Sequence, residues 1–186
     1  MGGSGSGLWR SMDAKTTVEE CKILDCGKLQ KDKLIREGVH HSGTLTWTNC
    51  RTGEITSSAG FTVNTLDPDT AWLELNYTIT WKDDARCGEQ EQIRERIGLT
   101  STMLAWGKRR WWFRCQLIVN GKLCNRRVGK LYMPPDGKYY GCRHCYDLTY
   151  ESSQEAHRFD HVIAMMALQM GITPKEVKRL AKKGLL

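Results

Sequence analysis

Apolar and polar side chains alternate along the chain between residues 42 and 99, a pattern that predicts strands with one buried and one solvated face. The clearest run comprises Leu73, Leu75, Tyr77, Ile79 and Trp81. Turn-forming sequences at 49–53 and 66–69 separate the runs, and a polar loop at 83–90 precedes the last one. We therefore predict an antiparallel meander of about four strands, which the segment 109–114 extends after a turn at 106–108.

Helical patterns precede the meander. Thr17 and Glu20 fit a capping box that opens a short helix, and Asp25 is placed to cap a second helix that runs to Gly38. Two short helices with a tight junction resemble half of a helix-turn-helix, although such pairs are more often plain packing units. Residues 2–7 consist of glycine and serine, which bury no apolar area, and this composition predicts disorder.

A second helical pair is predicted after residue 150. A helix over 153–170 ends at Gly171 and places five apolar residues on one face: Phe159, Val162, Ile163, Met166 and Met170. Thr173 then supplies the cap of a basic helix, with Pro174 at its first position and Glu176 completing a capping box. The chain therefore combines a sheet with helices at both ends.

Four cysteines lie in two groups between the meander and the last helices: Cys115 and Cys124, then Cys142 and Cys145. The residues between the groups, 125–140, predict a β-hairpin with a turn at 134–137. Two ligand loops joined by antiparallel strands are the layout of a zinc ribbon, in which four thiolates hold Zn²⁺ in a closed tetrahedron. Such a site has no open position for water, so we predict a structural metal and no enzyme activity.

Alternatives remain open at this centre. Eight residues separate Cys115 from Cys124, more than the two to four usual in structural sites, so a disulfide or free thiols would also fit. His144 could replace one cysteine as a ligand, although its place inside the second pair points its ring away from the metal. A helical pair of histidines, His157 and His161, lacks the glutamate of a metalloprotease motif. The remaining cysteines are scattered and are expected to bind no metal: Cys21, Cys26, Cys50 and Cys87.

Charge is distributed unevenly along the 186 residues, whose net charge is +7. Residues 1–107 carry 12 Lys/Arg against 15 Asp/Glu, giving −3, whereas residues 108–186 carry 16 against 6, giving +10. A basic segment rich in aromatic residues is typical of a protein that binds a phosphate backbone, although a well-solvated surface is an alternative explanation. The chain has no apolar run of membrane-spanning length and no secretory leader, so we expect no membrane partner and a cytoplasmic location.

Motifs at both ends of the chain form a recognisable set. They comprise residues 1–7, 9–10 and 15–21, Trp112-Phe113-Arg114-Cys115, residues 126–132, and the run from Gly141-Cys142-Arg143-His144-Cys145 to Ser152. Together they resemble a bacterial zinc-ribbon family whose members are mostly hypothetical proteins. The chain departs from that pattern at Gln116, Asn125 and Met103, where relatives usually have proline, glycine and cysteine. The resemblance implies a zinc-ribbon fold and no established activity.

The predicted fold class is α+β: an antiparallel β-sheet with a four-cysteine zinc ribbon, short N-terminal helices and a C-terminal helical pair. The expected division is 1–12 as a flexible N-terminus, 13–107 as helices and sheet, 108–150 as the ribbon and 151–186 as the helical pair. We predict a zinc-stabilised, non-catalytic protein that binds nucleic acid, DNA more than RNA. The candidate contact residues are Arg126, Arg127, Lys130, Lys138, Arg143, Lys175, Lys178, Arg179, Lys182 and Lys183. A protein-interaction module, such as an adaptor or inhibitor that docks on a nucleic-acid enzyme, is the alternative.

Overall fold

The computed structural model describes residues 15–48, 52–81, 87–153 and 160–182. The chain divides into two compact units, one formed by Glu20–Leu148 and the other by Met1–Glu19 together with Thr149–Leu186. The sequence-based division separated a sheet domain at 13–107 from a ribbon at 108–150. Most of both segments lies within the Glu20–Leu148 unit, and the Gly/Ser-rich segment at 1–12 lies outside the described residues.

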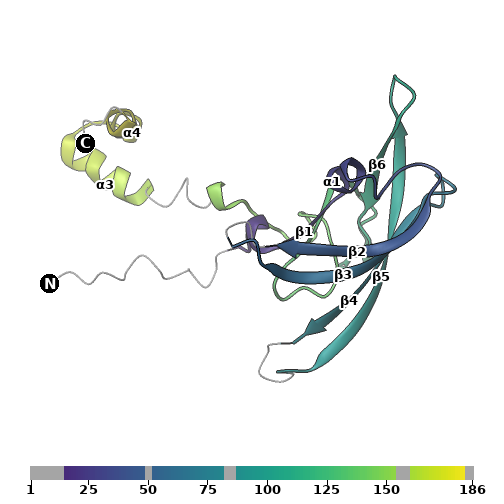
Figure 1. The fold of residues 1–186 in the computed structure, drawn as a ribbon. Coiled ribbons are helices and arrows are strands. Elements are labelled where there is room, and N and C mark those ends of the chain that lie inside the picture. Colours follow the sequence, from purple (N-terminus) through teal and green to yellow (C-terminus); the bar gives the residue numbers. More distant parts are fainter. Residues whose placement is uncertain (1–14, 49–51, 82–86, 154–159, 183–186) are drawn as a thin grey trace. The chain divides into compact units, whose positions relative to one another are not determined.

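The larger unit is built on one antiparallel sheet, whose long strands curl along their length (Figure 1). In sheet order the six strands are β2 (His40–Thr48), β3 (Ile55–Asn64), β4 (Trp72–Thr80), β5 (Gln90–Met103), β6 (Arg109–Arg114) and β9 (Arg127–Val128). The predicted meander is confirmed in β2 to β5, and β6 pairs with β5 as expected. The short strand β9 then adds a piece of the cysteine-bearing segment to the sheet.

Alternation along the strands gives the sheet a core face and an outer face. Residues opposite one another in register share a face, so Leu73 and Ile97 lie on the core side while Glu74 and Arg96 lie on the outer side. The core face carries buried apolar side chains from four strands: Phe61, Val63, Leu73, Leu75, Ile97, Leu99, Trp111 and Phe113. Burial of each of these side chains stabilises the fold by roughly 1.5–3 kcal/mol relative to exposure.

A two-stranded ladder shares this core. β1 (Lys22–Asp25) pairs antiparallel with β10 (Lys130–Met133), and Leu24 and Leu131 lie opposite one another with 2% and 0% of their surfaces exposed. The indole N–H of Trp47 on β2 donates to the carbonyl of Ile23 at 2.9 Å, which ties the ladder to the sheet. The prediction of a helix before residue 25 was wrong, because only a single 3-10 turn, η1 (Val18–Glu20), precedes β1. The long-range pairing with β10 decides this segment and overrides its local capping signal.

The next element, α1 (Cys26–Lys31), begins where the sequence predicted. The Asp25 carboxylate accepts hydrogen bonds from the N–H groups of Gly27 and Lys28 at 2.8 and 3.1 Å. The helix is shorter than predicted and ends at Lys31 rather than at Gly38. Lys33 adopts a φ of 60°, a left-handed conformation that terminates helices.

α1 also protects one edge of the sheet. The Gln30 side-chain amide donates to the carbonyl of Trp111 at 3.1 Å and accepts from the N–H of Trp111 at 2.8 Å. It therefore imitates one residue of a neighbouring strand along the part of β6 that lies beyond the short strand β9. A side chain in this position satisfies backbone groups that would otherwise be open to pairing with another chain.

The smaller unit contains the predicted C-terminal helical pair. α3 (Asp160–Met170) ends at Gly171, which has a φ of 63°, and α4 (Pro174–Lys182) follows. The predicted capping box of α4 is present. The Thr173 N–H donates to the Glu176 carboxylate at 2.9 Å, and the Glu176 N–H donates to the Thr173 hydroxyl at 3.4 Å.

The burial of α3 differs from the prediction. Val162 and Met170 were expected on a buried face but are exposed, whereas Ala167 is buried together with Val177 of α4. The small Ala167 side chain, rather than the larger side chains around it, is the buried position of this helix. Phe159 lies outside the described residues. None of the helices in the described ranges is long and apolar enough to cross a membrane.

Candidate metal centre

The first cysteine pair is brought together by a small hairpin that the sequence analysis missed. β7 (Ile118–Val119) and β8 (Lys122–Leu123) are joined by Asn120 and Gly121, which have φ angles of 53° and 74°. Two successive positive φ angles at an Asn-Gly pair indicate a tight type I′ turn. The hairpin returns the chain so that the N–H of Cys124 donates to the carbonyl of Leu117 at 2.9 Å. The wide spacing between Cys115 and Cys124 therefore results from a short hairpin inserted between the two cysteines.

The second pair sits on a tight turn, in which the N–H of Cys145 donates to the carbonyl of Cys142 at 3.0 Å. The turn is anchored by Gly141, which exchanges two backbone hydrogen bonds with Tyr132 of β10, at 2.7 and 2.9 Å. A Cβ atom on Gly141 would lie 2.1 Å from Leu117 Cδ1, so a larger residue here would displace the Leu117 side chain that packs between the two cysteine loops. The predicted hairpin from 125 to 140 is thus reduced to a single bridge between Tyr132 and Gly141.

The four sulfur atoms form a compact cluster in which every pair lies within 4.8 Å. The Sγ atom of Cys115 lies 3.7 Å from that of Cys145, and Cys142 lies 3.8 Å from Cys124 and 3.5 Å from Cys145. A disulfide would need about 2.05 Å. A metal bound to four sulfurs at about 2.3 Å places them roughly 3.8 Å apart in a tetrahedron. The cluster therefore has the dimensions of a four-coordinate metal site.

Backbone donors surround the sulfurs. The N–H of Cys142 donates to Cys115 Sγ at 3.2 Å. Burial raises the pKa of the Cys115 thiol to about 11, while the N–H groups of Leu117 and Cys142 oppose that rise. Burial also acts upward on Cys124, yet the N–H of Arg126 and the neighbouring thiols lower the pKa of Cys124 overall. Donors aimed at sulfur stabilise thiolates, which are the form that binds metal.

Among the described residues, the other cysteines and histidines considered in the sequence analysis are not members of this cluster. His144 is exposed and is not a member of it. Cys26 is buried, and desolvation, followed by the charge of Asp25, raises the pKa of its thiol to about 12. Cys21 is buried and Cys87 is exposed. Cys50 and His157 lie outside the described residues.

Five basic residues of the segment 108–148 were predicted to contact nucleic acid, and the two lysines among them pair with carboxylates. Lys130 pairs with Asp25 at 3.3 Å, and Lys138 pairs with Glu91, so carboxylates offset both charges. Arg127 extends over the ring of Trp112, with its guanidinium carbon 5.3 Å from the ring centroid. Arg126 is exposed, and Arg143 is half-buried.

The predicted contact residues of the smaller unit lie on α4. Lys175 and Arg179 are exposed, and Lys178 pairs with Asp160 of α3 at 2.8 Å. Lys182 is the last residue of α4, and Lys183 lies outside the described residues. Four of the eight Lys and Arg residues of the smaller unit therefore belong to this one short helix.

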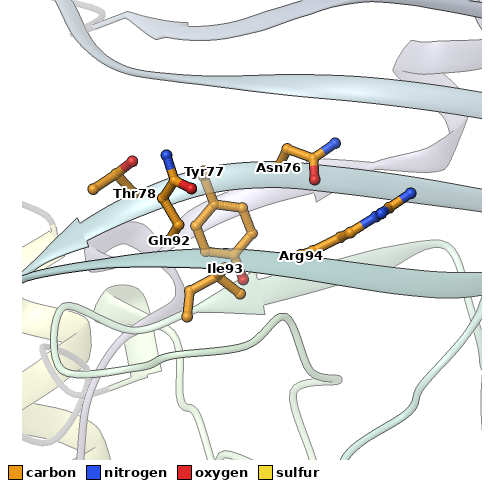
Figure 2. Close-up of a pocket in the computed structure, with 6 residues that line it drawn as sticks. All are labelled: Asn76, Tyr77, Thr78, Gln92, Ile93 and Arg94. Carbon is orange, nitrogen blue, oxygen red and sulfur yellow. The ribbon is translucent and has the colours of Figure 1, made fainter.

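A hollow of about 360 Å³ lies beside β4 and β5 (Figure 2). Its lining residues come from neighbouring positions of the two strands: Asn76, Tyr77, Thr78, Gln92, Ile93 and Arg94. The Tyr77 hydroxyl donates to the carbonyl of Lys138 at 2.8 Å, and burial, followed by the nearby Glu95 carboxyl, raises the pKa of this phenol. A phenol held neutral is a poor base and a poor nucleophile.

Comparisons with known proteins add no further assignment. No family model, curated protein or solved structure gives a significant match to the chain. The resemblance to a bacterial zinc-ribbon family therefore stays a prediction. The function has to be inferred from the chemistry of the four-cysteine cluster and from the charge around it.

Proposed function

We propose that the chain is a zinc-stabilised, non-catalytic nucleic-acid-binding protein, with DNA as the first candidate ligand. The observation that carries this proposal is the charge of the ribbon segment. Residues 108–148, all within the larger unit, contain ten Lys/Arg and two Asp/Glu. A folded surface with this excess favours a polyanionic partner such as a phosphate backbone.

Zinc is the metal that best suits the cysteine cluster. Four thiolates in a tetrahedron of this size are a common structural zinc site, and zinc imposes no other geometry because its d shell is full. Cys115, Cys124, Cys142 and Cys145 would occupy all four positions, leaving none for water or substrate. Bound there, zinc would stabilise the fold by joining the two cysteine loops and would supply no reaction chemistry.

Zinc stoichiometry tests this half of the proposal. We expect elemental analysis of the freshly purified protein to give one zinc per chain. The variant Cys26→Ala should retain that zinc, because the Cys26 thiol lies apart from the four-sulfur cluster. A chain that binds no zinc, or that loses it when Cys26 is replaced, would contradict the assignment of the ligands.

Salt dependence tests the other half. Neutralising phosphates releases counterions, so four contacts predict roughly a 50- to 150-fold loss of affinity between about 50 and 200 mM salt. The measurement is fluorescence anisotropy with labelled DNA and RNA oligonucleotides of equal length, single-stranded and duplex, at five salt concentrations. An affinity that stays constant across that series, or no binding to any of the oligonucleotides, would contradict nucleic-acid binding.

One observation favours the alternative, a protein-interaction module. The β7–β8 hairpin exposes apolar side chains, with 70% of Ile118 and 57% of Leu123 accessible to solvent. Clustered apolar side chains on an exposed hairpin are suited to docking on another protein. A protein partner held by this hairpin would bind with little dependence on salt, which separates the two functions in the same titration.

A further inference from the structure

The outer face of the large sheet combines arginine with tryptophan. Strand register places two tryptophans and five arginines on this face: Trp72, Trp112, Arg94, Arg96, Arg110, Arg114 and Arg127. Trp72 lies opposite Gly98 and Trp112 opposite Thr100, so the two rings belong to the same side of β4, β5 and β6. Four of these arginines, all except Arg127, were absent from the candidates that the sequence suggested.

Three of the five guanidinium groups of this face lie over the indole rings. The guanidinium carbon of Arg96 is 4.4 Å from the centroid of Trp72, and those of Arg110 and Arg127 are 4.3 and 5.3 Å from the centroid of Trp112. Arginine stacked in this way presents a flat, weakly hydrated cation to solvent, on which a nucleobase can stack in turn. The face therefore offers planar surfaces and positive charge in the same places.

The positive charge of this face is only slightly offset. Glu74 is the one acidic side chain on the outer face of the six strands, within the residues that the structure describes. It is buried beneath Arg94 and Arg96, with contacts of 2.7 and 3.2 Å, and the side chains of these two arginines remain 73% and 60% exposed. The hydrogen bond from Arg94 outweighs burial and lowers the pKa of Glu74, which keeps this carboxylate charged. In its described positions, the outer face therefore carries five arginines and one carboxylate.

Two arginines of this face also donate hydrogen bonds to neighbouring side chains. Arg114 is exposed and donates to the side-chain oxygen of Asn125 at 3.2 Å, and Arg127 donates to the Thr102 hydroxyl at 3.1 Å. The indole N–H of Trp112 is buried and has no hydrogen-bond partner within the described part of the chain.

We propose that the outer face of β4, β5, β6 and β9 is the binding surface for single-stranded nucleic acid. Arg94, Arg96, Arg110, Arg114 and Arg127 bind phosphates, and unpaired bases stack on the arginine–tryptophan layers at Trp72 and Trp112. Bases within a duplex are already stacked and paired, so a stacking surface of this kind selects single strands. This inference rests on the proposed nucleic-acid binding and assigns its location and its ligand class.

The test compares two double variants that each remove two positive charges. Arg110→Ala with Arg114→Ala changes the outer face, and Lys28→Ala with Lys31→Ala removes two exposed lysines of α1 as the matched control. A third variant, Arg110→Lys with Arg114→Lys, keeps both charges but loses the planar groups. Binding of fluorescein-labelled oligo-dT and of a duplex of equal length is measured as a function of salt, and zinc content and circular dichroism confirm that each variant is folded.

We expect wild type to bind the single strand more tightly than the duplex. The arginine-to-alanine variant should lose roughly 10- to 100-fold in affinity and flatten the slope of log affinity against log salt by about 1.4, whereas the α1 control should change little. The lysine variant should keep the slope and lose part of the affinity.

Other outcomes separate the inference from the function. If wild type binds but the outer-face variant matches the α1 control, nucleic-acid binding stands and this surface is not where it occurs. Tighter binding to the duplex overturns the single-strand assignment in the same way. If wild type binds neither probe, both the inference and the proposed function fail.

Discussion

Replacing Cys142 by serine is expected to abolish metal binding and to unfold the ribbon together with the core side of the sheet. Cys142 Sγ lies within 3.8 Å of two of the other cluster sulfurs, so its loss opens the tetrahedron. Structural zinc sites contribute roughly 10–16 kcal/mol of apparent free energy in small domains, against about 5–15 kcal/mol for the net stability of a domain. Removing one ligand therefore threatens the whole unit.

The unfolding should spread beyond the metal because residues next to Cys142 pack against the sheet. The Tyr140 ring stacks on Trp47, with centroids 6.2 Å apart, and the Tyr140 N–H donates to the Glu95 carboxyl at 3.1 Å. Tyr77 donates to the carbonyl of Lys138 at 2.8 Å. These contacts connect β2, β4 and β5 to the segment that ends in the second cysteine pair.

The measurements for Cys142→Ser are zinc content and thermal unfolding followed by circular dichroism. The control is Cys87→Ser, which removes a thiol that is exposed and lies outside the cluster. We expect the control to keep its zinc and its melting temperature. A Cys142→Ser protein that retains one zinc and melts within a few degrees of wild type would show that the four cysteines do not act as one site.

The sequence predicted much of the sheet because its physical cause is local. Alternation of apolar and polar side chains is visible along each strand, and the Asp25 cap and the Thr173 capping box need only a few neighbouring residues. The sequence also predicted that the four cysteines form one site, and in the structure their sulfur atoms lie within 4.8 Å of one another. These features depend on short-range patterns that a single sequence contains.

The features that were missed depend on partners far away in the chain. β1 forms because Leu24 lies opposite Leu131, and α1 is held by hydrogen bonds between Gln30 and the backbone of Trp111. Local signals at residues 17–25 favoured a helix, and tertiary pairing overrode them. The β7–β8 hairpin is different, since the Asn120-Gly121 pair is a strong local turn signal that could have been used.

The arginine–tryptophan face could also have been found from the sequence. Arg94 and Arg96 alternate with Ile93 and Ile97, so period two alone places both arginines on the solvated face of their strand. What the sequence does not contain is the register that brings β6 beside β5 and sets Trp112 opposite Thr100. Basic residues are densest along the chain in the segment 108–148, but carboxylates from other strands offset Lys130 and Lys138 there.

A second large effect is expected from Glu95, whose carboxyl group lies on the core face of β5. It is 7% exposed, and desolvation raises its pKa to about 7 despite hydrogen bonds from the Tyr140 N–H and the Tyr77 hydroxyl. The Tyr77 oxygen lies 2.8 Å from both the Glu95 carboxyl and the carbonyl of Lys138. Because Tyr77 has one hydroxyl hydrogen and a carbonyl only accepts, both contacts are satisfied when protonated Glu95 donates to Tyr77.

The sign of the pH dependence is set by that raised pKa. An unfolded glutamate titrates near 4.5, so the folded state binds the proton more tightly than the unfolded state does. The stabilisation from protonated Glu95 is fully present below about pH 4.5 and is lost as pH rises through about 7. The difference corresponds to roughly 3 kcal/mol of unfolding free energy between these limits.

Glu95→Gln should remove this dependence. The glutamine oxygen can accept from the Tyr140 N–H while its amide donates to the Tyr77 oxygen, which reproduces the contacts of the protonated acid. The variant should exceed the stability of wild type by about 1 kcal/mol or less near pH 5 and by roughly 3 kcal/mol near pH 8. Urea unfolding of zinc-saturated protein across this range measures the difference, since both proteins share any pH dependence of the metal site.

Glu91→Gln is the matched control, because it removes a carboxylate of the same strand that pairs with Lys138 at the surface. If the pH dependence disappears in Glu91→Gln and persists in Glu95→Gln, the titrating group is not Glu95. If the stability difference between Glu95→Gln and wild type is instead constant from pH 5 to pH 8, that result equally shows that Glu95 does not gain a proton on folding. We expect the difference in unfolding free energy from wild type to grow with pH for Glu95→Gln and not for Glu91→Gln. Only the Glu95→Gln variant folds without taking up a proton at the core face of β5.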